Sequence, residues 1–178
     1  MSDLKNVSQE VLISQEQLAA KVKELGERIT RDYEGEEILL VGILRGSVPF
    51  MADLMRAIDL DITIDFMSVS SYGSSTKSSG VVRILKDLET PIEGKNVMIV
   101  EDIIDSGLTL DYIKGYLQAR HPKSLRICAI LDKPSRRKVQ IRADYIGFEV
   151  DDKFIVGYGL DYDQHYRNLP YISWLKEQ

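Results

Sequence analysis

The sequence lacks the features that mark secreted, membrane-spanning and nucleic-acid-coating proteins. Its 178 residues contain one cysteine, Cys128, so an intrachain disulfide is impossible, and the apolar run around it predicts a buried thiol in a reducing compartment. No apolar run approaches the roughly 20 residues that a membrane span requires, and the opening segment MSDLKNVSQE lacks the layout of a signal peptide. The 28 acidic and 23 basic side chains give a net charge of −5, which disfavours a broad basic surface for nucleic acid or membrane. We therefore expect a cytoplasmic protein.

Strand and helix patterns alternate along a chain of one-domain length, and we expect a single domain over residues 1–178. Ser14 and Gln17 predict a capping box at the start of the first helix. Further helices are predicted at 50–58 and 108–119, and strands at 37–44, 62–69, 81–85, 96–100, 125–131, 144–150 and 154–160. These strands are too continuously apolar for a sheet with one wet face. They indicate an α/β fold, a mostly parallel twisted sheet flanked by helices.

The stretch NVMIVEDIIDSGLTL, at 96–110, runs from a predicted strand into the carboxylates Glu101, Asp102 and Asp105. Ligands of parallel sheets gather beyond the carboxyl ends of the strands. The turn DSGLT at a helix start offers free backbone N–H groups and the hydroxyls of Ser106 and Thr109, which suit a phosphate monoester. Carboxylates beside a phosphate would repel it unless they face hydroxyl groups or a divalent cation. A sugar phosphate would give this arrangement.

Two other interpretations of this stretch come from the residues alone. A solvated loop whose carboxylates favour the N-terminus of the following helix accounts for the composition equally well. A nucleotide hydrolase would combine this strand with a G-x-x-x-x-G-K-[ST] loop, and the sequence contains none. The hydrolase interpretation therefore fails.

The stretch VMIVEDIIDSGLTL closely resembles the phosphoribosyl-diphosphate signature of type I phosphoribosyltransferases, specifically the hypoxanthine-guanine phosphoribosyltransferases of the short bacterial form. The resemblance extends to the loop LRGS at 44–47, the pair Ser71-Tyr72, Lys133, the segment DKFIVGYGLDY at 152–162, and Arg167. It implies the type I phosphoribosyltransferase fold, with a small hood formed from terminal segments. The implied activity is purine salvage, in which the 5-phosphoribosyl group of phosphoribosyl diphosphate passes to hypoxanthine or guanine and pyrophosphate leaves.

Two departures from the family pattern are mild. Leu108 stands where some relatives carry Lys, and Arg45 stands where many carry Lys. Leu108 would contribute mainly its backbone N–H, so the expected activity is unchanged.

The resemblance also implies a role for each residue of the phosphoribosyl site. Glu101 and Asp102 would bind the ribose hydroxyls and help to hold Mg²⁺, with Asp161 on a second Mg²⁺. The 5-phosphate would be cradled by Asp105, Ser106, Gly107, Leu108 and Thr109. Pyrophosphate would meet Arg45, Gly46 and Arg167. Ser71 and Tyr72 would belong to a lid, formed by the loop SYGSSTKSSG, that closes over the pyrophosphate side.

The resemblance places the base between a cation and an aromatic ring. Lys133 would donate a hydrogen bond to the oxygen at purine position 6, where adenine instead presents an amino group. Phe154 would stack on the base, Ile155 would offer backbone contacts, and Asp161 would complete the base site. Asp105 resembles the general base near N7 of the purine, and acids around it would raise its proton affinity.

The expected partners are small-molecule substrates, with no nucleic acid and no membrane, and the chain is expected to form a homo-oligomer, either a dimer or a tetramer. One rival is a regulator that binds RNA and keeps the same phosphoribosyl loop. It would need a basic face, and the only basic cluster is KPSRRK at 133–138. Another rival is an adenine- or uracil-specific transferase, against which Lys133 and the segment 152–162 argue.

Overall fold

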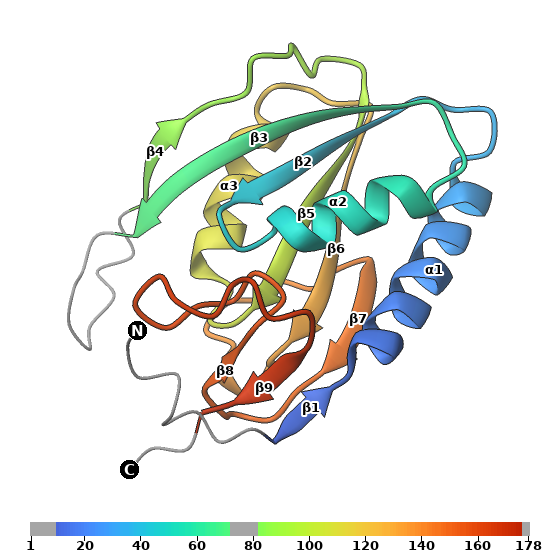
Figure 1. Ribbon diagram of the computed structural model, residues 1–178. Coiled ribbons are helices and arrows are strands. Elements are labelled where there is room, and N and C mark those ends of the chain that lie inside the picture. The colour runs from blue at the N-terminus through green and yellow to red at the C-terminus, as the bar shows by residue number, and fades with distance from the viewer. Residues whose placement is uncertain (1–9, 72–81, 176–178) are drawn as a thin grey trace.

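The computed structural model describes residues 10–71 and 82–175, which form a six-stranded sheet covered by helices and a smaller three-stranded sheet beside it (Figure 1). The strands of the large sheet, in spatial order, are β4 (Val82–Lys86), β3 (Ile62–Ser71), β2 (Ile38–Leu44), β5 (Asn96–Ile104), β6 (Ser124–Asp132) and β7 (Tyr145–Glu149). Neighbouring strands are parallel except for β3 and β4. The predicted α/β fold is confirmed.

Helices cover both faces of the large sheet. The helices α1 (Gln15–Asp32) and α2 (Val48–Ala57) lie on one face, and α3 (Leu108–Gln118) lies on the other (Figure 1). Alternate residues of β5 serve the two faces, because Met98 and Val100 pack toward α1 and α2 while Val97 and Ile99 pack toward α3. A strand buried on both sides must be apolar throughout, which explains the unbroken run NVMIV.

The predicted capping box of α1 is confirmed. The Ser14 hydroxyl accepts from the Gln17 backbone N–H at 3.2 Å, and the Gln17 side chain accepts from the Ser14 backbone N–H at 2.8 Å. Cys128 is buried and free, as its apolar surroundings predict, and burial raises the pKa of its thiol. No helix in the described part of the chain is long and apolar enough to cross a membrane.

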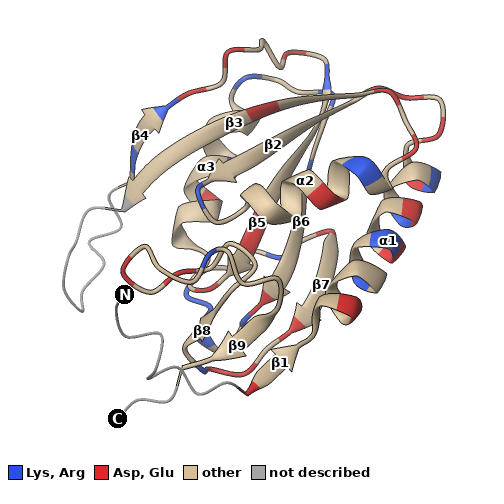
Figure 2. Ribbon diagram, viewed as in Figure 1, with Lys and Arg blue, Asp and Glu red and all other residues tan. Residues whose placement is uncertain are grey.

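The order of the strands opens a crevice between β2 and β5. From β2 the chain passes through α2 to β3 on one side, and from β5 it passes through α3 to β6 on the other. The loops that follow β2 and β5 therefore diverge, and ligands bind at such a switch point in open α/β sheets. Figure 2 shows acidic residues at the carboxyl end of β5, beside this crevice.

The smaller sheet is a hood made largely from the two ends of the described chain. Its strands are β1 (Val11–Ile13), β9 (Ile172–Trp174) and β8 (Ile155–Val156), paired antiparallel in that order. The strand predicted at 154–160 is wrong in length, because β8 has only two residues. Gly157 and Gly159 take φ angles of 100° and 98°, which turn the chain out of the sheet.

Two other element boundaries differ from prediction. The strand β5 continues to Ile104 instead of ending at Val100, so Glu101 and Asp102 lie inside the strand. Its pairing with β6 continues to Ile104 opposite Asp132, and this ladder keeps the acidic residues extended. The helix α2 begins two residues before the predicted position 50, with Pro49 in its first turn.

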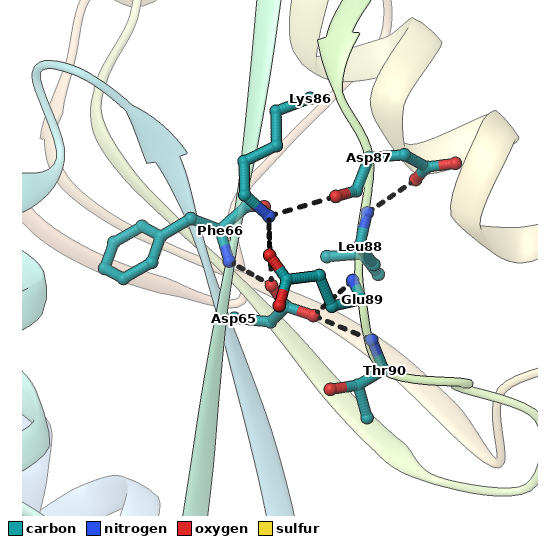
Figure 3. Close-up of polar contacts among 7 residues, drawn as sticks. All are labelled: Asp65, Phe66, Lys86, Asp87, Leu88, Glu89 and Thr90. Carbon is teal, nitrogen blue, oxygen red and sulfur yellow. Dashed lines mark hydrogen bonds and ion pairs between the residues drawn. The ribbon is translucent and has the colours of Figure 1, made fainter.

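A buried carboxylate fixes the segment that follows β4 to the neighbouring strand β3 (Figure 3). Asp65 accepts hydrogen bonds from the backbone N–H groups of Phe66, Glu89 and Thr90 at 2.7, 2.9 and 3.0 Å. Lys86 lies 3.6 Å from Asp65 and donates to the Phe66 carbonyl at 3.2 Å. These contacts satisfy the buried charge, so Asp65 has a structural role.

Candidate active site

The crevice contains a cavity of about 310 Å³, the carboxylate cavity. Its polar lining comes from the ends of β2 and β5, the start of α3 and the segment after β8. The residues that supply it are Gly46, Glu101, Asp102, Asp105, Ser106, Gly107, Thr109, Asp161 and Arg167. The structure therefore gathers most of the residues predicted to meet the sugar, its phosphate and the pyrophosphate.

Glu101 and Asp102 are only partly exposed at the wall of this cavity. The Oε2 atom of Glu101 is buried and has no hydrogen-bond partner within the described residues. Burial, reinforced by the neighbouring Asp102, raises the pKa of Glu101 well above its ordinary value. Burial likewise raises the pKa of Asp102 to about 6, although the backbone N–H of Ile103 and the charge of Arg167 oppose the shift. This pair of acids is short of positive partners.

Gly46 brings the loop after β2 directly against Asp102. A Cβ atom at this position would lie 1.6 Å from Asp102 Oδ2, so no larger residue fits without moving the carboxylate. The preceding peptide bond, between Leu44 and Arg45, is cis. Gly159 approaches from the other side, because its Cβ would lie 1.9 Å from the Gly46 carbonyl oxygen. The loop LRGS therefore lies where the Gly46 backbone, the Asp102 side chain and the Gly159 backbone come into close contact.

The first turn of α3 closes the far end of the carboxylate cavity. Gly107 caps this helix with a φ of 81° and makes no side-chain cap bond, and its Cβ would lie 2.6 Å from Ile141 Cγ2. The Ser106 hydroxyl lies 3.4 Å from the Leu108 N–H. Backbone N–H groups at a helix start, with the hydroxyls of Ser106 and Thr109 beside them, form a site suited to an anion.

Two predicted pyrophosphate residues converge on a residue that the sequence reading missed. Arg45 Nη1 and Arg167 Nη2 both donate to Gln164 Oε1, at 2.9 and 3.2 Å. Arg167 also lies 2.8 Å from Asp161 Oδ1 and donates to the Gly159 carbonyl at 2.7 Å. Arg45 does not line the carboxylate cavity, and it is linked through Gln164 Oε1 to Arg167, which does.

A second cavity of about 420 Å³, the lysine cavity, adjoins the first. It is lined by Ile103, Asp105, Lys133, Arg136, Asp152, Lys153, Phe154, Ile155, Leu160 and Asp161. All four residues predicted to bind the base are in this set. Ile103, Asp105 and Asp161 line both cavities, so the two spaces meet at these residues.

Lys133 is buried at the end of β6 with its ammonium group held in place. Its Nζ donates to the Lys153 carbonyl at 2.6 Å, and burial lowers its pKa, opposed by the charges of Asp105 and Asp152. An ammonium group has three donors, so one hydrogen bond to a carbonyl leaves donors for a ligand. The ring of Phe154 is 46% exposed and stands edge-on to Tyr162 at 5.6 Å, which leaves an aromatic surface for a planar ligand.

Asp105 has a cationic neighbour that the sequence reading did not include. Arg136 Nε lies 2.9 Å from Asp105 Oδ1, and Arg137 Nη1 donates to the Asp105 carbonyl at 2.7 Å. The prediction for this residue considered only acidic neighbours, and the structure adds these two guanidinium groups. Arg137 also pairs with the buried Asp132.

The carboxylates fit magnesium only in company with a ligand. No three His, Cys, Asp or Glu side chains in residues 10–71 and 82–175 are grouped closely enough to hold a metal by themselves. Glu101 Oε2, which has no hydrogen-bond partner among the described residues, and the carboxylate of Asp102 are hard oxygen donors. Asp161 is engaged by Arg167 and by the Gln164 backbone N–H at 2.9 Å. Magnesium typically uses one or two carboxylates together with substrate phosphates and water, which this arrangement suits.

The predicted lid falls largely outside the described residues. Ser71 is the last residue of β3, and Tyr72 lies in the segment 72–81, which is not described. The residues that sequence reasoning missed are Arg136, Lys153 and Gln164. Each acts through a contact with a residue distant in sequence or through a backbone group, so no local motif announces it.

Comparison with known proteins places the chain in one family. Residues 8–163 match the phosphoribosyl transferase domain family. The hypoxanthine-guanine phosphoribosyltransferase of Bacillus subtilis is 55% identical over 173 residues, which cover 97% of this chain and 96% of that protein.

Solved structures agree. A crystal structure of a Bacillus anthracis hypoxanthine-guanine phosphoribosyltransferase superposes with a TM-score of 0.91 at 54% identity, over 94% of this chain and 99% of that one. A Staphylococcus aureus hypoxanthine phosphoribosyltransferase gives a TM-score of 0.93 at 50% identity, over 97% and 93% of the two chains. The chain therefore belongs to the phosphoribosyltransferase family, among the hypoxanthine-guanine phosphoribosyltransferases.

Proposed function

We propose that this protein transfers the 5-phosphoribosyl group of phosphoribosyl diphosphate to N9 of hypoxanthine or guanine, giving IMP or GMP and pyrophosphate. The observation that carries this proposal is the meeting of two cavities, one with Glu101 and Asp102 and the other with Lys133 and Phe154, at residues that they share. A sugar phosphate in the carboxylate cavity and a planar base in the lysine cavity would have their reacting atoms side by side. Holding two reactants in this way removes much of the entropic barrier to their reaction.

The carboxylate cavity supplies the contacts of the sugar and its phosphate. The first turn of α3, from Gly107 to Thr109, would bind the 5-phosphate through backbone N–H groups and hydroxyls. Glu101 and Asp102, which lie in β5 before this turn, would accept hydrogen bonds from the ribose hydroxyls. Both acids lie inside β5, so the sheet holds them in a fixed position relative to α3.

Mg²⁺ is the proposed cofactor, held by Glu101 and Asp102, with Asp161 for a second ion. When bound there, the metal would supply positive charge that offsets the negative charge of the departing pyrophosphate. Arg45, Gly46 and Arg167 would bind pyrophosphate itself, and the convergence of both guanidinium groups on Gln164 Oε1 shows how closely they approach. Positive charge at this position stabilises the leaving group as the bond to C1 breaks.

The lysine cavity supplies base selection. Lys133, held by the Lys153 carbonyl, would donate to the oxygen at purine position 6, whereas the amino group of adenine would face it donor to donor. Phe154 would stack on the ring, and Ile155 would present backbone groups to its edge. Asp105, at the junction with the sugar, would accept the proton near N7 as C1 bonds to N9.

The rival function of an RNA-binding regulator finds less support. The basic run at 133–138 is partly engaged inside the protein, because Lys133 is buried and Arg137 pairs with Asp132 and the Asp105 carbonyl. An RNA-binding regulator would need these charges on an open face.

We also propose a cytoplasmic homo-oligomer, either a dimer or a tetramer, which light scattering of the purified protein would test.

A product assay tests the reaction. The purified protein is incubated with phosphoribosyl diphosphate, Mg²⁺ and one free base at a time, chosen from hypoxanthine, guanine, xanthine, adenine and uracil. We expect IMP and GMP, no AMP or UMP, and loss of turnover when EDTA removes the metal. Formation of AMP or UMP at the rate of IMP would refute the assignment of base selection. A shifted band with folded RNA and no nucleotide product would favour the regulator instead.

A further inference from the structure

Arg136 stands between two carboxylates at the wall of the lysine cavity. Its Nε lies 2.9 Å from Asp105 Oδ1, and its Nη1 lies 3.2 Å from Asp152 Oδ1. The two acids are 47 positions apart in sequence (152 − 105), and one comes from the end of β5 while the other precedes β8. A single guanidinium group therefore links the two sides of the cavity.

The backbone of Arg136 is itself fixed to the sheet. It ends a short 3₁₀ turn, Pro134–Arg136, and its N–H donates to the Lys133 carbonyl at 3.2 Å. The Lys133 N–H in turn donates to the Ile104 carbonyl at 2.9 Å. Proline restricts the first position of the turn. The guanidinium group is thus presented from a firm base and not from a free loop.

Lys133, which directly precedes this turn, and Arg136, which ends it, contact two consecutive residues of the opposite cavity wall. Lys133 donates to the Lys153 carbonyl at 2.6 Å, and Arg136 pairs with the side chain of Asp152. Phe154 follows directly, and its carbonyl accepts from the Leu175 N–H at 2.9 Å. The position of the aromatic ring therefore depends on these contacts.

The exposure of the ion pair argues against a role in folding stability. The side chains of Arg136 and Asp152 are 51% and 53% exposed, and an ion pair this exposed contributes little to the free energy of unfolding, whereas the Asp105 Oδ1 atom that faces Arg136 is buried without a hydrogen bond among the described residues. Arg136 also lines the lysine cavity but not the carboxylate cavity. Asp105, which Arg136 contacts, lines both cavities, so the effect of Arg136 should fall mainly on the base and only weakly on the sugar phosphate.

We propose that Arg136 is a positioning residue of the base site, which holds the carboxylate of Asp105 and the segment that carries Phe154 at the separation that a planar base requires. This inference rests on the proposed function, because it assigns a purine to the lysine cavity. Arg136 acts through Asp105 and Asp152, so it shapes the slot in which the base lies and aims the group that accepts its proton. A guanidinium group suits this task because its planar fork reaches two carboxylates through separate nitrogens.

The test compares Arg136→Gln and Arg136→Lys with the wild type. Arg136→Gln should raise KM for hypoxanthine and guanine about tenfold and lower kcat several-fold, with KM for phosphoribosyl diphosphate changed less than about twofold. Arg136→Lys keeps the charge but cannot reach both acids, so it should recover part of the loss. Asp152→Asn removes one of the two contacts and should give a smaller increase in KM for the base.

Lys123→Gln serves as the matched control. Lys123 pairs with Glu36 at 2.7 Å, and the two side chains are 54% and 46% exposed, close to the values for Arg136 and Asp105. Lys123 directly precedes β6, at the end of that strand opposite to Lys133. It should leave all kinetic constants unchanged, and thermal unfolding of all four variants should match the wild type within a few degrees.

Two outcomes would overturn the inference. One is wild-type kinetics for hypoxanthine in Arg136→Gln. The other is an equal loss for base and sugar donor together with a lowered melting temperature, which would indicate a purely structural role. Calorimetric binding of GMP is measured alongside turnover. A wild type that binds GMP without turnover would refute the proposed reaction alone, and weaker binding of GMP by Arg136→Gln would still support the inference.

Discussion

The two cavities of this protein treat their charged groups in opposite ways. In the carboxylate cavity, Glu101 and Asp102 are desolvated and short of positive partners. In the lysine cavity, Lys133 is held by the Lys153 carbonyl, and Arg136 is shared between Asp105 and Asp152. A ligand that brings its own cation and hydroxyl groups can satisfy the carboxylates of the first cavity. A neutral planar ligand brings no charge, so the side chains of the lysine cavity must already be in position to bind it. The difference indicates that the carboxylate cavity is completed by its ligand and that the lysine cavity is preorganised.

The largest expected effect comes from removing the unsatisfied acids. The double variant Glu101→Gln and Asp102→Asn should lower kcat/KM for phosphoribosyl diphosphate by about a hundredfold or more, because the groups proposed to bind ribose and magnesium lose their charge. The fold should survive, since both amides are less costly to bury than carboxylates. Steady-state kinetics at varied magnesium checks this. Wild-type use of the sugar donor and metal would contradict the assignment.

Lys133→Gln alters the preorganised cavity instead. A hydrogen bond from a charged donor contributes about 1.5–3 kcal/mol, so kcat/KM for hypoxanthine and guanine should fall about ten- to a hundredfold. The amide offers either a donor or an acceptor, so the gap between oxopurines and adenine should narrow while KM for phosphoribosyl diphosphate stays the same. Full discrimination against adenine, or an equal loss for the donor and the bases, would remove the base-reading role from this residue.

The free energy of unfolding of the ligand-free protein should depend on pH through the acids of the carboxylate cavity. Asp102 has its pKa raised from 3.8 to about 6, so the folded state binds this proton more tightly than the unfolded state. The free energy of unfolding is therefore greatest below the ordinary pKa, and it falls by about 1–3 kcal/mol as the pH rises from about 4 to about 6. Asp102→Asn should remove that part of the decline and be more stable than the wild type at pH 7.

Urea unfolding of both proteins across this range, in buffer containing EDTA, gives the difference directly. Glu101 has its pKa shifted in the same direction, in part by the charge of Asp102, so the difference between the two proteins includes the relief of Glu101 when that charge is removed. A difference that does not vary with pH, or an Asp102→Asn protein less stable at pH 7, would show that the acid is well satisfied in the folded state.

The smallest expected effect comes from adding one methyl group at two glycines. A Cβ at Gly46 would displace Asp102, so Gly46→Ala should lower kcat/KM for the sugar donor about tenfold. Gly115 lies inside α3 with nothing within 4 Å of an added Cβ, so Gly115→Ala should leave the kinetics unchanged and stabilise the helix by about 0.5–1 kcal/mol. Kinetics and thermal unfolding of the two variants test the pair. Equal kinetics would show that Asp102 can move without consequence.

Local patterns predicted much of this architecture. The capping residues of α1 and the apolar runs of the central strands depend on neighbours in sequence, and the structure confirms them. The end of β5 was predicted four residues too early, because its length depends on how far β6 runs beside it. Such pairing is a property of two distant segments.

The site divides in the same way. The residues from Glu101 to Thr109 are contiguous and form a recognisable motif. Arg136 contacts Asp152, 16 positions away, Gln164 accepts from Arg45, 119 positions away, and Lys153 contributes a carbonyl group that every residue possesses. No feature of the sequence distinguishes these three from ordinary surface residues before the fold brings them to the cavities.

The hood affects the order in which the two cavities can form while the chain is being synthesised. The strand β8 pairs only with β9 among the described strands, and the Phe154 carbonyl is bound by the Leu175 N–H. A nascent chain that has emerged as far as α3 already contains β2, β5 and the helix start that line the carboxylate cavity. The aromatic wall of the lysine cavity must wait until residues 172–175 have left the ribosome and closed the hood. Synthesis therefore delivers the phosphate-binding turn first, and it delivers Asp161, Arg167 and the aromatic wall last.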